Sequence, residues 1–184
     1  MRRAIFQEPP PNVDETWTHG AMLGGMIGYG DEDLAESYFL AGDTLIAAIA
    51  NGEADGRELV NPVMYVYRHG IELYLKCIVR PEQKNHSLGS LLDAFCRHIR
   101  EGYGEAVPAV ITKPISEFAK YDQRSDVFRY ETDRNGKTHE PLGYDGEFWI
   151  DLPSMKASMA VLRRSFRRVL WADRAGEIPP AGVG

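Results

Sequence analysis

The sequence predicts a mainly α protein: an antiparallel bundle of four to five helices with one β-hairpin inserted near residues 127–140. Three observations support this fold class. Apolar residues recur at intervals of three and four over several long segments, as they do on the buried face of a helix. Capping residues, Gly and Pro bound these segments and leave short connections. One stretch alone changes to the alternating pattern of a strand.

The first 30 residues are expected to be an N-terminal arm or linker, because "PPP" and "GAMLGGMIGYG" disfavour regular structure. Residues 31–175 form the predicted helical domain, and residues 176–184 a flexible tail. Asp31 caps the first predicted helix, which ends at Asn51 before Gly52.

Three further helices follow in order. Asn61 and Pro62 suit the cap and first turn of the second helix, which ends before Pro81. Ser87 caps the third, which Gly102 closes. The fourth is a short element over residues 113–122.

Residues 127–140 then alternate apolar and polar side chains. Asn135-Gly136 tolerates the positive φ angles of a tight hairpin turn, and Pro141 limits the second strand. The last predicted helix runs from about Pro153 to Asp173.

The composition and net charge limit the classes of function that are compatible with this chain. The chain has 184 residues, of which 43% are hydrophobic and 26% charged, with a net charge of -6. This suits a single domain and excludes a protein covered over most of its surface by nucleic acid, although a local basic face remains compatible. Cys77 and Cys96 lie in apolar helical segments, as expected of free thiols in a reducing compartment.

We therefore expect a cytoplasmic protein without a membrane segment, since no stretch is apolar for the roughly 18 residues that a span needs. Neither the cysteines nor the histidines have the spacing of a zinc site, and no metal or other cofactor is predicted.

The predicted second helix contains an unusual stretch, "VYRHGIELYLKCIV", in which four ionisable residues share one side. Two interpretations remain open. Neighbours four residues apart can form surface ion pairs. Alternatively, because the other faces are apolar, the row borders a groove or a dimer contact. The four residues are Arg68, His69, Glu72 and Lys76.

The last predicted helix has an apolar face opposite a basic one. The basic face can follow an RNA backbone, with Trp171 available for stacking, or it can pair with acidic residues of the chain or of a partner. Its arginines are Arg163, Arg164, Arg167 and Arg168.

The segment "NPVMYVYRHGIELYLKCIV", followed by "HSLGSLLDAF", resembles the HEPN superfamily of small prokaryotic helical bundles over roughly residues 31–100. The "FRYETDRNGK" hairpin is similar to an insertion in some uncharacterised bundles of this kind. The resemblance implies a homodimer. Many members are metal-independent ribonucleases, and others are inactive binding or partner-recognition modules.

Active members share an Arg, four to six residues and a His, often with Asn after the Arg. Two alternative segments match: Arg80 to His86, and Arg134 to His139. By this resemblance, the His transfers protons at a ribose hydroxyl or leaving oxygen while the Arg stabilises charge on phosphorus. Structural roles compete, because His86 can help to cap a helix and Asn135-Gly136 can form a turn.

Our leading hypothesis is a HEPN-like domain that binds RNA or a nucleotide, with metal-independent RNA cleavage as a candidate activity. Its setting, a prokaryotic defence or toxin-antitoxin system, follows from the resemblance alone. The alternative is a non-catalytic protein-interaction module with the same fold, and a third option is a structural domain without a ligand.

Overall fold

The structure, a computed structural model, describes residues 30–81, 86–122, 125–130 and 149–176, together with Ala21, Thr132 and residues 135–136. The chain divides into two units, Met1–Gly30 and Asp31–Gly184, and the second contains the fold. Its described residues form five helices and no strand. The helices are α2 (Asp31–Ala50), α3 (Gly56–Val79), α4 (Leu88–Tyr103), α5 (Ala109–Tyr121) and α6 (Leu152–Ala175).

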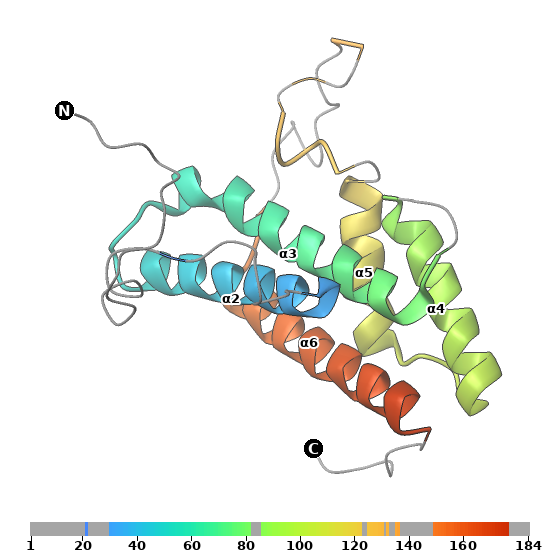
Figure 1. Cartoon of the computed structure of the whole chain (residues 1–184). Helices are drawn as coiled ribbons and strands as arrows, with labels where there is room; N and C mark the ends of the chain where they lie inside the picture. The colour runs from blue at the N-terminus through green and yellow to red at the C-terminus, as the bar shows by residue number, and fades with distance from the viewer. Residues whose placement is uncertain are drawn as a thin grey trace. The chain divides into compact units, whose positions relative to one another are not determined.

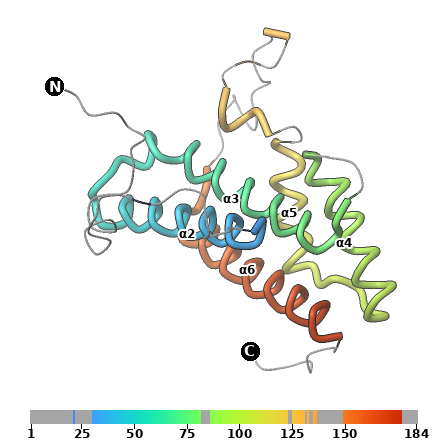
Figure 2. The backbone as a smooth tube through the Cα atoms, viewed as in Figure 1, coloured from blue at the N-terminus to red at the C-terminus, as the bar shows by residue number. Residues whose placement is uncertain are grey.

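The helices pack as a mainly α bundle, as predicted. Helices α2 and α3 form an antiparallel pair, and α6 packs against both (Figure 1). Helices α4 and α5 form a second antiparallel pair. Helix α4 contacts α3, and α5 contacts α6 (Figure 2).

Two glycines allow α2 and α3 to approach closely. A Cβ atom at Gly42 would lie 2.6 Å from the Tyr67 ring, and one at Gly70 would lie 2.8 Å from the Phe39 ring. Each helix thus offers a glycine to an aromatic ring of the other, and any larger side chain would force them apart.

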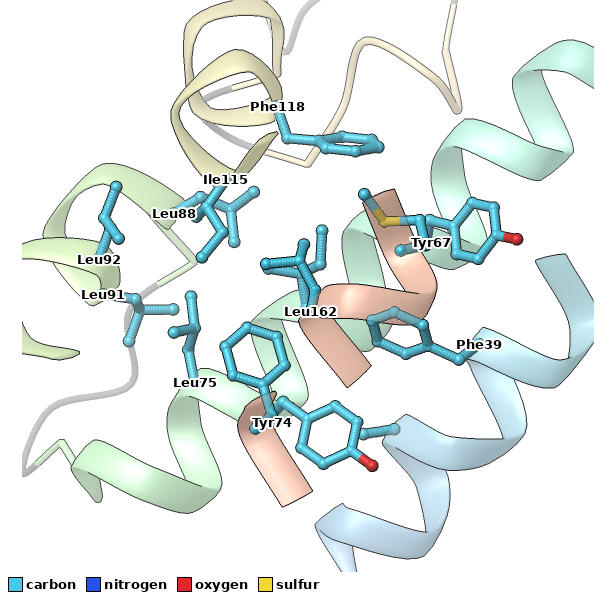
Figure 3. Packing of buried hydrophobic residues seen from close by; sticks show 14 of the residues in the cluster. Phe39, Tyr67, Tyr74, Leu75, Leu88, Leu91, Leu92, Ile115, Phe118 and Leu162 are labelled. Carbon is cyan, nitrogen blue, oxygen red and sulfur yellow. The ribbon is translucent and has the colours of Figure 1, made fainter. Parts of the chain in front are cut away.

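The core lies where the five helices meet (Figure 3). Tyr74 stacks on Phe166 with 5.2 Å between ring centroids, and Phe39 meets Tyr74 edge-on at 5.7 Å. The hydroxyl of Tyr74 donates to Glu36, and that of Tyr67 donates to Asp43 at 2.7 Å. Both tyrosines therefore bury their rings while their polar ends are hydrogen-bonded.

The helix ends follow recognisable caps. Ser87 caps α4 as predicted, accepting from the Ser90 amide at 3.3 Å. Helix α4 continues through Gly102 to Tyr103, and Gly104, which has a φ of 71°, is its C-cap. Helix α3 begins at Gly56, not near Asn61 as predicted, because Asp55 caps it by accepting from the Arg57 amide at 2.8 Å.

No hairpin is seen among the described residues of the 127–140 segment. The predicted strand is wrong for residues 127–129, which form a turn: the amides of Arg129 and Tyr130 both donate to the Asp126 carbonyl, at 3.1 and 3.0 Å. The Asp122 carboxylate accepts from the Asp126 amide at 2.8 Å and so fixes this turn. Thr132 makes an isolated bridge and Gly136 has a φ of 75°.

Most of the remaining hairpin segment lies outside the described residues, and there the hairpin stays a prediction. The same holds for the predicted N-terminal arm except Ala21 and Gly30, and for the predicted tail beyond Gly176.

Candidate functional site

The charged row on α3 forms the centre of a buried ionic cluster. The side chains of Arg68 and Glu72 are 0% and 1% exposed. Arg68 Nη1 donates to Glu72 Oε2 at 2.5 Å. Lys76 Nζ lies 2.6 Å from Glu72 Oε1, and His86 Nδ1 lies 2.7 Å from the same oxygen. One carboxylate thus contacts three basic groups, one of them from outside α3.

Arg68 connects three segments of the chain. Its Nη2 donates to the His86 carbonyl, just before α4, at 2.8 Å. Its Nε donates to the carbonyl of Asp122, just after α5, at 3.2 Å and lies 3.0 Å from the Asp122 Oδ2 atom. The guanidinium therefore fixes the start of α4 and the end of α5 to α3.

The electrostatics of Glu72 follow from these contacts. Burial alone would raise the pKa of Glu72, but the hydrogen bonds from Lys76 and Arg68, the Lys76 charge and the His86 contact outweigh burial and lower the pKa. Glu72 is therefore a buried carboxylate that stays ionised near neutral pH.

His86 is the most accessible member of the cluster. Its side chain is 63% exposed, while its Nδ1 contacts the buried Glu72. A carboxylate that orients one ring nitrogen leaves the other to exchange protons with a ligand, which is the arrangement of a general acid or base. Ser87, rather than His86, is the N-cap residue of α4.

The two predicted Arg-to-His pairs differ in what the structure describes. Arg80 is exposed at the end of α3, with a φ of 44°. No hydrogen bond joins Arg80 to His86 in the described part of the chain. Arg134 and His139 lie outside the described residues.

His69 belongs to a different environment. The centroid of its ring lies 4.5 Å from that of Tyr38, which it meets edge-on, and 5.9 Å from that of Tyr65, on which it stacks. The guanidinium group of Arg129 lies over the Tyr65 ring, 5.5 Å from its centroid. Burial lowers the pKa of His69, which favours its neutral form.

The arginines of α6 fall into two groups. Arg163 is half-buried, donates to Glu36 and lies 3.7 Å from Asp43. Arg164, Arg167 and Arg168 are exposed. The predicted pairing with acidic residues of the chain thus holds for Arg163, and Arg167 Nε also lies 3.7 Å from Glu36 Oε1. The side chains of Arg164, Arg167 and Arg168 are nevertheless exposed to solvent.

The exposed arginines line a pocket of about 390 Å³. Trp171, which is 55% exposed, belongs to the same pocket. The spacing explains this: residues three and four apart lie on one side of a helix. Sequence reasoning missed two members, because Glu32 comes from another helix and Arg174 lies past the predicted helix end. The lining residues are Glu32, Arg164, Arg167, Arg168, Trp171 and Arg174.

A second pocket, of about 500 Å³, lies between α5, α6 and α3. Met64, Phe118 and Met155 form part of its apolar wall, and the 91% exposed Trp149 stands at its edge.

Comparison with family models, with curated proteins and with solved structures found no match for this chain. Among the described residues, no group of three or more His, Cys, Asp or Glu side chains is arranged to hold a metal ion. None of the described helices combines the length and the apolar character that crossing a bilayer requires.

Proposed function

We propose that this chain is an RNA-binding domain of the HEPN-like kind, in which the α6 pocket binds the phosphate backbone. The observation that carries the proposal is the presence of four arginines and one exposed tryptophan in a single pocket. The defence or toxin-antitoxin setting belongs to the same proposal and rests on the sequence resemblance alone.

The chemistry of the pocket matches a single strand of RNA. Guanidinium groups bind phosphate oxygens with two hydrogen bonds at a time. An exposed tryptophan provides a face on which a base can stack, and base–aromatic stacking contributes about 1–3 kcal/mol. Arg164 makes no ion pair or hydrogen bond within the described part of the chain, so binding a phosphate costs it no internal partner.

The test is binding of a fluorescein-labelled, unstructured RNA measured by anisotropy. The Arg164→Gln, Arg168→Gln double variant should bind roughly tenfold more weakly or worse, because two charge-assisted contacts are lost. The matched control is Arg97→Gln with Arg100→Gln, which removes two exposed arginines from α4. Equal losses in both double variants would contradict a site on α6 and indicate general charge attraction.

Metal-independent RNA cleavage is a second candidate activity, favoured by the His86–Glu72 contact of 2.7 Å. Cleavage should persist in EDTA and disappear in His86→Asn, which keeps a polar side chain without the proton-transfer group. The same variant should retain RNA binding through the α6 pocket. Intact RNA after prolonged incubation at high protein concentration would reduce the proposal to binding alone.

The rival function is a protein-interaction module, which the apolar pocket beside Trp149 favours. Under this proposal, RNA binding would be absent at low salt. The homodimer implied by the resemblance is tested separately, by light scattering of the purified chain over a range of concentrations.

A further inference from the structure

The α6 pocket contains a carboxylate among its four guanidinium groups. Glu32, in the first turn of α2, lines the pocket although its negative charge would repel a phosphate. Its Oε2 accepts from Arg174, and its Oε1 has no hydrogen-bond partner in the described part of the chain. A pocket for phosphate alone gains nothing from an anion, which repels the ligand. Arg174 is one partner of this carboxylate, and its Oε1 atom can accept from a second donor.

The pocket has an order along α6. Arg164, Arg167 and Arg168 precede Trp171, whereas Arg174 follows it by almost one turn. Glu32 pairs with Arg174, and Glu36, one turn further along α2, lies 3.7 Å from Arg167. Along α6, Arg164, Arg167 and Arg168 therefore lie at one end of the pocket, the indole in its middle, and the ion pair of Glu32 and Arg174 at the other end.

The order of arginines, indole and carboxylate along the pocket matches the order of phosphate, base and base edge in a nucleotide. When a base stacks on Trp171, its phosphates extend towards the three arginines on one side, and its hydrogen-bonding edge faces Glu32 on the other. The pocket volume of about 390 Å³ falls within the range of about 300–1,000 Å³ that small ligands occupy.

A carboxylate discriminates between the bases. It has acceptors only, so it requires donors on the base edge. Guanine presents two adjacent donors, its N1–H and its 2-amino group. Adenine and cytosine each place a ring acceptor beside their amino donor, and uracil flanks its single N–H with two carbonyls. Only guanine therefore presents donors to Oε1 and to the remaining lone pair of Oε2, which already accepts from Arg174, without placing an acceptor against either oxygen.

We infer that the α6 pocket selects a guanine nucleotide within single-stranded RNA, with the Glu32 carboxylate accepting from the guanine edge. This inference rests on the proposed function and adds base specificity to it. Trp171 stacks the base, and the exposed arginines bind the adjoining phosphates.

The test uses labelled pentanucleotides and the full chain. The RNA 5′-AAGAA-3′ should bind at least about fivefold more tightly than 5′-AAAAA-3′, 5′-AACAA-3′ or 5′-AAUAA-3′. Inosine in place of guanine, which removes the 2-amino group alone, should lose most of this preference.

Glu32→Gln separates base recognition from a merely structural role. The variant should bind 5′-AAGAA-3′ and 5′-AAAAA-3′ equally, with the affinity for 5′-AAAAA-3′ unchanged or increased because one negative charge is gone. If Glu32 only positions Arg174, all pentanucleotides would change by one common factor and the guanine preference would persist, which overturns the inference. Glu101→Gln on α4, where the carboxylate is exposed, is the matched control and should leave every affinity unchanged.

The outcomes also distinguish the inference from the proposed function. RNA binding that depends on Arg164 and Arg168 but shows no guanine preference overturns the inference and leaves the proposed function standing. Absence of RNA binding at low salt removes both.

Discussion

At the scale of single residues, the charged pair of Arg68 and Glu72 is the most demanding feature of the fold. Both side chains are almost fully buried, and burying charges is costly unless their partners compensate for the lost hydration. Here the compensation is nearly complete, because Glu72 contacts three basic groups and Arg68 also donates to two carbonyls. Losing either residue leaves buried charge without its partner.

Glu72→Gln is expected to destabilise the fold by about 3–5 kcal/mol, because Arg68 and Lys76 would lose the carboxylate that neutralises them. Urea unfolding at pH 7 measures this loss. Arg57→Gln, which breaks an ion pair at a 91% exposed side chain, is the control and should change the unfolding midpoint little. Similar losses in both variants would contradict the importance of burial.

His69 makes the stability depend on pH. Its pKa is lowered in the folded state, mainly by burial, so the unfolded chain binds more protons below the ordinary value of 6.5. Stability should therefore be fully present above pH 6.5 and fall as the pH decreases through that value towards the lower folded-state pKa. The charged groups that act on His69 are Glu72, which opposes the shift, and Arg68, Lys76 and Arg129, which add to it.

Unfolding curves recorded between pH 8 and pH 5 check this expectation. His69→Phe keeps an aromatic ring between Tyr38 and Tyr65 but cannot be protonated, so its stability should vary less over this range. A variant that lost stability as steeply as the natural chain would assign the dependence to other groups.

The sequence predicted part of this residue-scale chemistry. Helical spacing placed Arg68, Glu72 and Lys76 on one side of α3, and Glu72 does form ion pairs with both of the others. The spacing could not reveal that the side is buried, because the covering residues His86 and Asp122 come from distant segments. Their approach depends on tertiary packing, which periodicity within one helix does not report.

At the scale of elements, the α2–α3 pair depends on small residues at the crossing. Gly42 and Gly70 face aromatic rings at distances that leave no room for a Cβ atom. A glycine within a helix lowers its intrinsic stability relative to alanine. The close contact between the two helices offsets this cost, so the glycines act through packing rather than through backbone freedom.

Gly70→Ala is expected to destabilise the protein by roughly 1–3 kcal/mol, because the added methyl group would overlap the Phe39 ring. Gly102→Ala on α4 is the matched control: nothing lies within 4 Å of its added Cβ, and the variant should gain up to about 1 kcal/mol from helix propensity. Thermal unfolding of both variants gives the comparison. Stabilisation by both substitutions would mean that α2 and α3 do not pack this closely.

The helix ends show where sequence reasoning succeeds at this scale and where it stops. Ser87 was predicted correctly because a capping residue acts locally. The start of α3 was placed too late because Pro62 favours a first turn, whereas Asp55 is the cap and the exposed Pro62 lies inside the helix. The turn at residues 127–129 is fixed by the carboxylate of Asp122, four residues before Asp126, and the alternation of apolar and polar residues does not indicate this contact.

At the scale of the whole molecule, the overall charge conflicts with the proposed ligand. The net charge is -6, yet the α6 pocket gathers four arginines. Attraction for RNA must therefore be local, and the rest of the surface should repel a long nucleic acid. This combination favours short or single-stranded segments over extended duplexes.

The salt dependence of RNA binding should reflect this restriction. If Arg164, Arg167 and Arg168 each neutralise one phosphate, a plot of log affinity against log salt concentration should have a slope of about -2 for a single strand. Anisotropy titrations at several salt concentrations, from about 50 to about 300 mM, measure this slope. A much steeper slope would indicate a larger binding surface than the α6 pocket.

The position of Arg68 also has a consequence for how the protein opens. Since this one side chain is hydrogen-bonded to the backbone just before α4 and just after α5, neither helix of that pair can detach without breaking a hydrogen bond to Arg68. Helices α4 and α5 should therefore exchange their amide hydrogens with deuterium as a single cooperative unit. In Arg68→Met, the protection of both helices should decrease together, while α2 retains more of its own.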